Sequence, residues 1–190
     1  MPKLILIKHA PPVVDPAKPA HLWRLSEAGR EKSGALAERL RSHSPQVIVA
    51  SEEPKAHETA AIVAEELRVP WESAPGLHEH DRSNVPHMRS AEFISMMELF
   101  FRRPGELVLG KETAEAAGDR FKRALEDVMR RHADKNVAIV SHGTVLAIYL
   151  APLMRKASFE LWRELGLPSY AVLDAPEMTV REVVATLDHD

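Results

Sequence analysis

Three short hydrophobic runs in this 190-residue chain are each followed directly by polar or charged residues. The runs are residues 4–7, 47–50 and 137–140, and the polar segments after them are Lys8-His9, residues 51–55 and Ser141-His142-Gly143. The lysines at 8 and 55 can neutralise an anion, and a neutral imidazole near pH 7 is also a nucleophile. These residue types, placed at the ends of three such runs, predict a phosphate site between His9 and His142.

The three hydrophobic runs have the pattern of strands buried inside a sheet. Each is four residues long and apolar at every position, which is typical of a strand covered on both faces. Because ligands bind at the carboxyl ends of parallel strands, we expect the three polar segments to meet at one edge of the sheet. Each segment also leads toward a helix, whose first N–H groups attract anions.

Helical patterns separate these strands along the chain. Ser26 is expected to cap a first helix and Pro54 to begin a second, and further helices are expected over residues 91–101, 113–131 and 144–154. Two more strands are expected over residues 170–173 and 179–186. Strands that alternate with helices predict the α/β class, as a three-layer sandwich with a mostly parallel central sheet and helices on both faces.

Two segments are expected to be irregular. Residues 11–23 contain four prolines and no periodicity, and residues 70–86 are rich in Pro, His, Asp, Asn and Ser. With no repeat or linker in sight, residues 1–190 are predicted to form one domain in which residues 70–112 are an inserted cap or lid. The large aromatic residues are expected to serve packing; they are Phe93, Phe100 and Phe101 of the lid and Trp23, Trp71 and Trp162.

Composition narrows the classes of partner. The formal net charge of -3 argues against nucleic-acid binding by general electrostatics. The absence of cysteine excludes disulfides and thiolate metal sites, and it fits a reducing compartment. The longest apolar stretch, residues 145–154, is interrupted by Pro152 and is too short to span a bilayer. We therefore expect a cytoplasmic protein that binds a small phosphorylated substrate, with neither nucleic acid nor membrane as partner, and a homodimer stays open.

Five segments resemble, in order along the chain, the conserved motifs of one known protein family. They are residues 4–10 (LILIKHA), 25–30 (LSEAGR), 51–60 (SEEPKAHETA), 77–79 (LHE) and 137–150 (VAIVSHGTVLAIYL). The first resembles a strand followed by Arg-His-Gly, and the last, which is the most specific, resembles a second-histidine strand and its helix. In this order the set resembles the histidine phosphatase superfamily, the phosphoglycerate mutase-like proteins, over most of the chain.

The resemblance implies a phosphatase that hydrolyses a phosphomonoester through a phosphohistidine, without metal or other cofactor. It implies that His9 is the nucleophile, that His142 contacts the phosphate, and that Glu79 protonates the leaving alcohol and then acts as base. The implied phosphate-binding residues are Lys8, Lys55 and Gly143. A glutamate serves as acid only if its pKa is raised, here by partial burial or by the charge of the phosphate.

Four positions depart from the family pattern. Lys8 and Lys55 stand where the family has arginine, so the charge is kept but the planar fork that grips phosphate oxygens in pairs is lost. Ala10 replaces a glycine and restricts the backbone if a positive φ is needed there. Asp15 replaces a frequent asparagine, and its charge would repel phosphate if it pointed inward.

These departures leave other functions open. Arg82 or Arg89 of the lid can compensate for a weaker phosphate grip; alternatively, the chain is a catalytically weak or inactive relative that binds a phosphorylated ligand as a sensor or scaffold. A phosphoglycerate mutase-type phosphotransferase is a further alternative, although such mutases tend to be longer. A metal-dependent hydrolase is the last, because residues 78–81 (HEHD) carry a dense set of potential ligands.

Overall fold

A six-stranded sheet forms the centre of the molecule in the computed structural model, which describes residues 2–187. The strands lie in the order β3-β2-β4-β1-β5-β6. Their bounds are β1 Lys3–Lys8, β2 Val47–Ala50, β3 Trp71–Ser73, β4 Val137–Ser141, β5 Ser169–Asp174 and β6 Thr179–Val184. The pairs β1–β4, β2–β4 and β2–β3 are parallel, whereas β5 is antiparallel to both β1 and β6. The expected mostly parallel sheet is confirmed.

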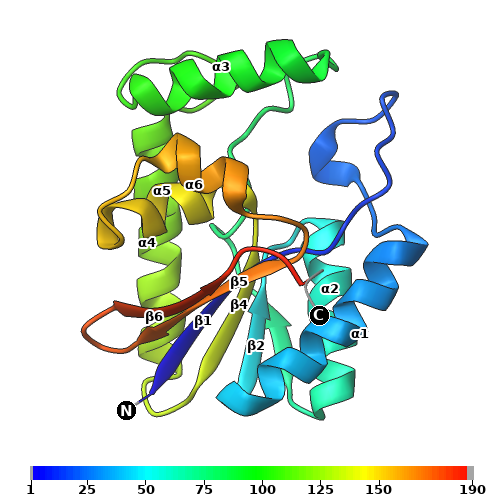
Figure 1. Ribbon diagram of the computed structural model, residues 1–190, viewed down its shortest axis with the longest axis vertical. Coiled ribbons are helices and arrows are strands. Elements are labelled where there is room, and N and C mark those ends of the chain that lie inside the picture. The colour runs from blue at the N-terminus through cyan, green and yellow to red at the C-terminus, as the bar shows by residue number, and fades with distance from the viewer. Residues whose placement is uncertain (1, 188–190) are drawn as a thin grey trace.

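Helices cover both faces of this sheet (Figure 1). They are α1 Glu27–Leu40, α2 Pro54–Leu67, α3 Ser90–Arg102, α4 Ala114–Arg131, α5 Gly143–Leu153 and α6 Ser158–Glu164, with short 3-10 helices at Ala20–Leu22 and Arg41–His43. The Ser26 hydroxyl accepts a hydrogen bond from the Gly29 N–H at 3.0 Å, as expected of the cap of α1, and Pro54 is the first residue of α2. The predicted beginnings of these two helices, each inferred from a single residue, are therefore confirmed.

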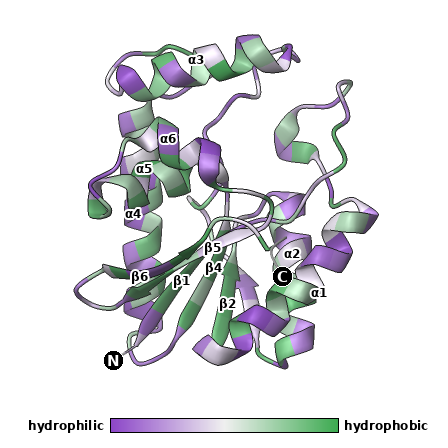
Figure 2. Cartoon of the chain, viewed as in Figure 1, coloured by the Kyte–Doolittle hydropathy of each residue, from purple (hydrophilic) through white to green (hydrophobic). Residues whose placement is uncertain are grey.

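Alternate side chains of β1 enter the two hydrophobic layers. Leu4 and Leu6 pack with residues of α4 and α5, and Ile5 and Ile7 pack with residues of α1 and α2. All four are buried, so the strand is apolar at every position because both of its faces are covered. Figure 2 shows hydrophobic residues concentrated in the sheet and on the inner sides of the helices. This three-layer arrangement confirms the predicted fold class.

The lid differs in part from the expectation. Residues 71–73 were expected to be irregular, but they form β3, which pairs with β2 in parallel at the sheet edge. The segment predicted to be a cap therefore starts with a strand of the central sheet, and the cap itself stays a prediction. Its helix α3 was predicted within one residue at each end, and it packs against α6, a seven-residue helix that was not predicted. A three-residue edge strand and a two-turn helix are too short to show a period.

The lid has a hydrophobic cluster of its own. Phe100 is fully buried there with Met97, and Phe101 packs between this cluster and Phe159 of α6. Figure 1 shows α3 beyond α5 and α6, away from the sheet. The packing roles expected for Phe100 and Phe101 are thus confirmed. The assignment of residues 1–190 to one domain stays a prediction, and Met1 and residues 188–190 lie outside the described part.

Within residues 2–187, no helix combines the length and the hydrophobicity that crossing a membrane requires.

Candidate active site at the carboxyl edge of the sheet

A cavity of about 540 Å³ opens where β1, β2 and β4 end. Lys8 pairs with Ser141 across the parallel strands β1 and β4, so His9 and His142 follow side by side. Their ring centroids are 5.2 Å apart, at an interplanar angle of 60°. The six site residues predicted from the sequence all line this cavity; they are Lys8, His9, Lys55, Glu79, His142 and Gly143. The structure therefore brings them together, while their individual roles remain predictions.

His9 is held so that one ring nitrogen is left for chemistry. Its backbone N–H donates to the Ser141 carbonyl at 3.1 Å, and its side chain is buried, with 6% of the residue exposed. Nδ1 lies 2.8 Å from the Ala10 carbonyl oxygen, which can only accept, so Nδ1 carries the proton and Nε2 has a lone pair. Burial, and then the neighbouring His142 ring and the Lys55 ammonium, hold the pKa of His9 well below its usual value. The imidazole is therefore neutral near pH 7.

His142 has a buried nitrogen with no partner. Its Nε2 lies 2.8 Å from the Ser51 hydroxyl at the end of β2, and 3.6 Å from a carboxylate oxygen of Glu53. Among the described residues, Nδ1 of His142 has no hydrogen-bond partner although it is buried. Burial, followed by the charge of Lys55, lowers the pKa of His142 well below its usual value. A bound anion would satisfy this atom, either by donating from a protonated oxygen to the Nδ1 lone pair or by accepting from Nδ1 when that nitrogen carries a proton.

The two lysines are both engaged. Nζ of Lys8 donates to the Leu165 carbonyl at 2.6 Å, and burial lowers the pKa of Lys8 to about 8 although the charge of Glu79 opposes this. Nζ of Lys55 donates to Glu53 Oε2 at 2.5 Å and to the Ala20 carbonyl at 2.8 Å. The positive charge expected at Lys55 is therefore paired with a buried carboxylate before any phosphate arrives.

Gly143, the first residue of α5, makes room for Lys8. A Cβ at this position would lie 2.9 Å from Cε and 3.2 Å from Nζ of Lys8. These distances are below normal van der Waals contact, so any other residue here would displace the lysine. The glycine therefore lets an ammonium group approach the start of a helix, where backbone N–H groups also favour an anion.

Glu79 is bound to the start of α5. Its Oε2 accepts from the Thr144 N–H at 3.0 Å, and Oε1 accepts from the His80 N–H at 2.8 Å. Burial alone would raise its pKa, but Arg82, His142 and these backbone N–H groups together lower the pKa to about 2. The expectation that partial burial raises the pKa is therefore wrong for the free protein, because the hydrogen bonds and cations outweigh desolvation.

Several cavity residues were missed or misjudged from the sequence. Glu53, 8% exposed, received no role, although a charge between a buried strand and Pro54 was a usable signal. Its Oε1 accepts from the Glu79 N–H at 2.8 Å. Trp23 and Trp162 were expected to be structural, but both line the cavity. The sequence did not reveal this because Trp23 lies in an irregular segment and Trp162 in a helix that was not predicted.

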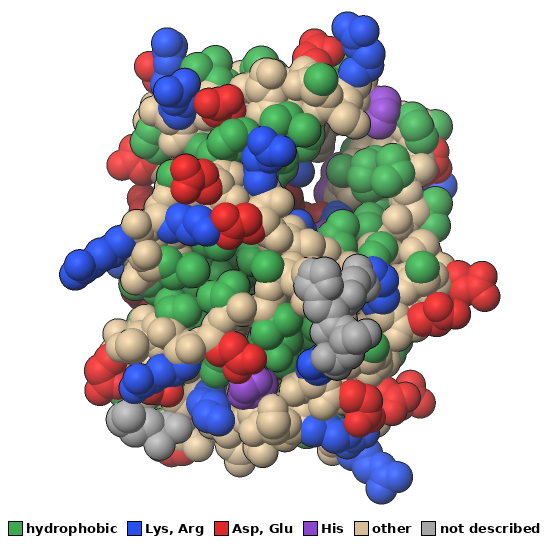
Figure 3. Space-filling model, viewed as in Figure 1, with side chains coloured by type: hydrophobic (Ala, Val, Ile, Leu, Met, Phe, Trp, Pro, Cys, Tyr) green, Lys and Arg blue, Asp and Glu red, His purple; other side chains and the backbone are tan. Residues whose placement is uncertain are grey.

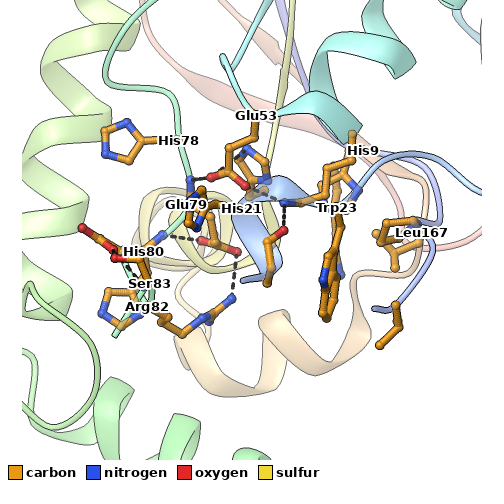
Figure 4. A pocket seen from close by; sticks show the side chains of 18 of the residues that line it. His9, His21, Trp23, Glu53, His78, Glu79, His80, Arg82, Ser83 and Leu167 are labelled. Carbon is orange, nitrogen blue, oxygen red and sulfur yellow. Dashed lines mark hydrogen bonds and ion pairs between the residues drawn. The ribbon is translucent and has the colours of Figure 1, made fainter. Parts of the chain in front are cut away.

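The lid contributes one arginine to the cavity. Arg82 lies 4.0 Å from Glu79 and within reach of the Thr144 hydroxyl at 3.5 Å, whereas Arg89 does not line the cavity. Figure 4 shows the Arg82 guanidinium directed toward the Glu79 carboxylate. Of the two arginines considered from the sequence, the structure therefore places Arg82 where it could compensate for the lysines.

Two departures from the family pattern are harmless to the geometry. Ala10 is not among the described residues with positive φ, and its N–H donates to the Thr59 hydroxyl of α2 at 3.1 Å. Asp15 does not line the cavity; its carboxylate accepts from the Ala17 N–H at 3.0 Å and pairs with Lys18 at 3.2 Å. The charge of Asp15 therefore points away from the phosphate position.

The segment of residues 78–81 does not form a metal site. All four residues line the cavity, yet His80 is buried against the ring of Phe100 and its Nε2 bonds to the Glu112 carbonyl at 3.0 Å. Across residues 2–187, no three His, Asp or Glu side chains are arranged to hold a metal ion together. This geometry gives no support to a metal-dependent hydrolase.

Comparison with known sequences places the chain in a family. The sequence pattern of the histidine phosphatase superfamily (branch 1) matches residues 20–181. The chain belongs to this superfamily. The resemblance drawn from the ordered motifs is confirmed, whereas the match begins after His9, so the role of that residue stays a prediction.

Two relatives with phosphatase names share part of the sequence. The metal-independent phosphoserine phosphatase of Arabidopsis thaliana is 32% identical over 141 residues, which is 66% of this chain and 57% of that protein. The uncharacterized phosphatase PhoE of Bacillus subtilis (strain 168) is 27% identical over 129 residues, which is 68% of this chain and 64% of that protein. The chain thus spans less than two thirds of the length of these relatives.

Solved structures share the fold over nearly the full length. A mycobacterial glucosyl-3-phosphoglycerate phosphatase complexed with VO3 has a TM-score of 0.76 at 19% identity, covering 98% of this chain and 100% of that one. A mutant phosphoserine phosphatase from Entamoeba histolytica, in complex with phosphoserine, has a TM-score of 0.77 at 16% identity, covering 98% of both chains. At these identities the likeness concerns the fold.

Proposed function

We propose that this chain is a phosphatase that hydrolyses a phosphomonoester through a phosphohistidine on His9. The observation that carries the proposal is the hydrogen bond from Nδ1 of His9 to the Ala10 carbonyl at 2.8 Å. It fixes the tautomer in which Nε2 is the nucleophile, in a ring whose pKa is held low by burial. Family membership and the phosphatase names of the relatives support the same activity.

The reaction has two displacement steps. Nε2 of His9 attacks the phosphorus, the ester P–O bond breaks, and the departing alkoxide takes a proton from Glu79. Water then loses a proton to the Glu79 carboxylate and attacks the phosphorus. The P–N bond breaks, its electron pair returns to Nε2, and inorganic phosphate leaves. Lys8, Arg82 and the Gly143 N–H at the start of α5 neutralise the charge on the transferring oxygens, since the next two N–H groups of α5 donate to Glu79.

The first step needs a protonated Glu79, although the pKa of this group is about 2 in the free protein. The second ionisation of a phosphomonoester has a pKa of about 6, so a part of the substrate enters as the monoanion. Transfer of that proton to Glu79 leaves the phosphate as the dianion beside Lys8 and supplies the acid. The charge of the bound phosphate also raises the pKa of the carboxyl group.

A weak or inactive phosphate-binding protein is the second candidate, and a specific observation favours it. Lys55 stands where the family has arginine, and the buried Glu53 already holds it at 2.5 Å. A phosphate must then compete with a carboxylate for one of the cations expected to bind it. This lowers affinity for the phosphate without removing His9 or Glu79 from the cavity.

Turnover of p-nitrophenyl phosphate by the wild type and by the His9→Ala variant tests the proposal. We expect the variant to lose at least about 10³-fold in kcat, because the substitution removes the proposed nucleophile. The wild type, quenched during turnover, should carry an acid-labile phosphoryl group on His9. His57→Ala is the matched control, since His57 is exposed on α2 and does not line the cavity. Equal and negligible turnover in all three proteins would leave the binding candidate.

A further inference from the structure

A second cavity, of about 470 Å³, adjoins the first. One wall is the loop after His9, with Pro16 and Pro19, and the other wall is the lid, with Val85, Phe93 and Ile94. None of its lining residues is acidic, and most are apolar. Figure 3 shows a hollow between these two parts of the surface, with hydrophobic side chains on both sides of it. Its volume falls within the range of sites that hold small organic ligands.

The two cavities are continuous. Ala20, Trp23 and Arg82 line both of them. The Trp23 indole N–H donates to the carbonyls of Asp15 and Lys18, each at 3.0 Å, so the ring is fixed between the two spaces. A molecule whose phosphate lies beside His9 can therefore extend past Trp23 into the second cavity.

Arg82 divides the polar space from the apolar one. Its guanidinium carbon lies 5.1 Å from the centre of the Phe93 ring, and its Nη2 lies 4.0 Å from Glu79. The charge is thus directed toward the carboxylate, while a face of the guanidinium is covered by an aromatic ring. Beyond Arg82 the walls offer contact to hydrocarbon rather than to an ion.

Two of the three basic side chains that line the second cavity are paired with acids, and the third is the imidazole of His87. Arg82 faces Glu79, and Lys18 pairs with Asp15 at 3.2 Å. A leaving group that carries a carboxylate would have to compete with these acids, whereas an apolar group would gain contact with the walls. The same loop also exposes hydrophobic side chains near the entrance, with Val14 57% exposed and lining the first cavity.

We propose that the second cavity binds an apolar leaving group, an aromatic or branched aliphatic alcohol, of the phosphomonoester whose phosphate lies at His9. This rests on the proposed phosphatase function and names its substrate class. The site selects against small carboxylated alcohols such as serine, because its walls are mostly apolar and its lysine and arginine are already paired with acids.

The test compares substrates that differ in the leaving group but share a primary alkyl ester bond. The probes are 2-phenylethyl phosphate, ethyl phosphate and phosphoserine. We expect kcat/KM for 2-phenylethyl phosphate to exceed the values for the other two by at least about tenfold, since burying a few apolar carbons in a pocket discriminates by this much. Equal values for 2-phenylethyl and ethyl phosphate, or a preference for phosphoserine, would overturn the proposal.

A matched pair of variants locates the effect. Ile94→Asp puts a carboxylate on the wall of the second cavity and should lower the ratio of kcat/KM for 2-phenylethyl over ethyl phosphate about tenfold. Leu99→Asp makes the same kind of change on α3 at a residue that is 36% exposed and lines neither cavity, so its ratio should equal that of the wild type. An unchanged ratio in Ile94→Asp, in a variant whose thermal unfolding matches that of Leu99→Asp, would contradict the proposal.

Calorimetric titration separates this proposal from the phosphatase function. If no ester is hydrolysed, the dissociation constants of 2-phenylethyl phosphate and of inorganic phosphate are compared instead. Tighter binding of the ester, weakened by Ile94→Asp, would support the apolar site while the phosphatase function fails. Turnover of all three substrates with equal kcat/KM would support the function and overturn the apolar site.

Discussion

Two regions of the cavity are built in opposite ways. The floor (His9, Ser51 and His142) lies on the ends of central strands, where the Ser51 N–H donates to the Val140 carbonyl at 2.9 Å and all three residues are buried. The rim (residues 11–23 and 82–94) consists of loops and the start of α3, with Val13 53% and Leu22 49% exposed. Because the sheet holds the floor, its residues can keep their positions around a phosphate while the loops of the rim differ in shape. The difference predicts that changes to the floor alter kcat and that changes to the rim alter the choice of substrate.

The largest effect should come from Glu79→Gln. Loss of the acid and base is expected to lower kcat for ethyl phosphate about 10²- to 10⁴-fold, because an alkoxide leaves poorly without a proton. The loss for p-nitrophenyl phosphate should be much smaller in the first step, since nitrophenolate is a stable anion. Steady-state kinetics and single-turnover release of nitrophenolate check this. Glu52→Gln, at the exposed neighbour of Glu53, is the control. Equal losses in single-turnover release from both substrates would show that Glu79 does not protonate the leaving group.

The second prediction concerns Arg120 of α4, which ties the segment carrying Glu79 to the core. Its Nη1 donates to the carbonyls of Gly76 and His78, at 2.9 and 2.8 Å, and Nη2 donates to that of Glu79 at 3.2 Å. Arg120→Gln should lower the free energy of unfolding by about 2–3 kcal/mol, because charged donors are lost from partly buried carbonyls. Urea denaturation measures this.

Arg123→Gln serves as the control for Arg120, because Arg123 is exposed on the same helix. We also expect kcat of Arg120→Gln to fall for ethyl phosphate more than for p-nitrophenyl phosphate, since the change acts through the position of Glu79. A stable Arg120→Gln variant with wild-type kcat would mean that the sheet and α5 alone position Glu79.

The floor could be predicted from sequence for a physical reason. A four-residue apolar run such as residues 4–7 has few structures open to it besides a strand buried on both faces, and parallel strands put their carboxyl ends on one edge. The arrangement of the strands alone therefore predicts that His9 and His142 are neighbours. By contrast, the three residues of β3 and the seven of α6 show no period, because tertiary contacts decide their structure.

The ion pairs and pKa values of the site could not be predicted from the sequence in this way. The ion pair of Lys55 with Glu53 depends on the first turn of α2, and the second acceptor of Lys55, the Ala20 carbonyl, comes from the irregular loop. The low pKa of Glu79 depends on the start of α5, which is distant in sequence. Contacts between segments that are far apart in the chain, with no motif to mark them, thus set the electrostatics.

The third prediction is a pH effect at Lys8, the last residue of β1, which precedes His9 of the floor. The pKa of Lys8 is lowered to about 8 by burial, so its positive charge is lost as the pH rises through about 8. All variants lose kcat/KM as the substrate monoanion disappears over this range, and loss of the Lys8 charge should lower kcat/KM about tenfold further between about pH 7 and pH 9. Lys8→Arg keeps its charge throughout and should remove most of this further decrease, whatever its activity near pH 7.

Profiles of kcat/KM against pH for the wild type, Lys8→Arg and Lys122→Arg check the assignment. Lys122 is 63% exposed at its side chain on α4, so its variant should reproduce the wild-type profile. The same alkaline decrease in Lys8→Arg would assign the titration to a group other than Lys8. A decrease removed by Lys8→Arg alone would tie phosphate binding to the β1 end of the floor.

The smallest effect is expected at Glu53, an acid bound to both a lysine and the segment of Glu79. Its Oε2 accepts from Lys55 at 2.5 Å, and its Oε1 accepts from the Glu79 N–H at 2.8 Å. Glu53→Gln keeps an oxygen for the Glu79 N–H but removes the charge that competes with phosphate for Lys55. Competitive inhibition by inorganic phosphate should therefore strengthen about three- to tenfold, the size expected when a nearby like charge is removed in a partly screened site.

Glu52→Gln again serves as the control, since it removes the same charge at an exposed position one residue away. If Glu53→Gln strengthens phosphate inhibition and Glu52→Gln does not, the weak grip lies in the Lys55–Glu53 pair and not in the replacement of arginine by lysine. If Glu53→Gln instead weakens phosphate binding, the carboxylate holds Lys55 in a productive position. In that case the pair belongs to the phosphate site, and the floor is preorganised by an acid as well as by the strands.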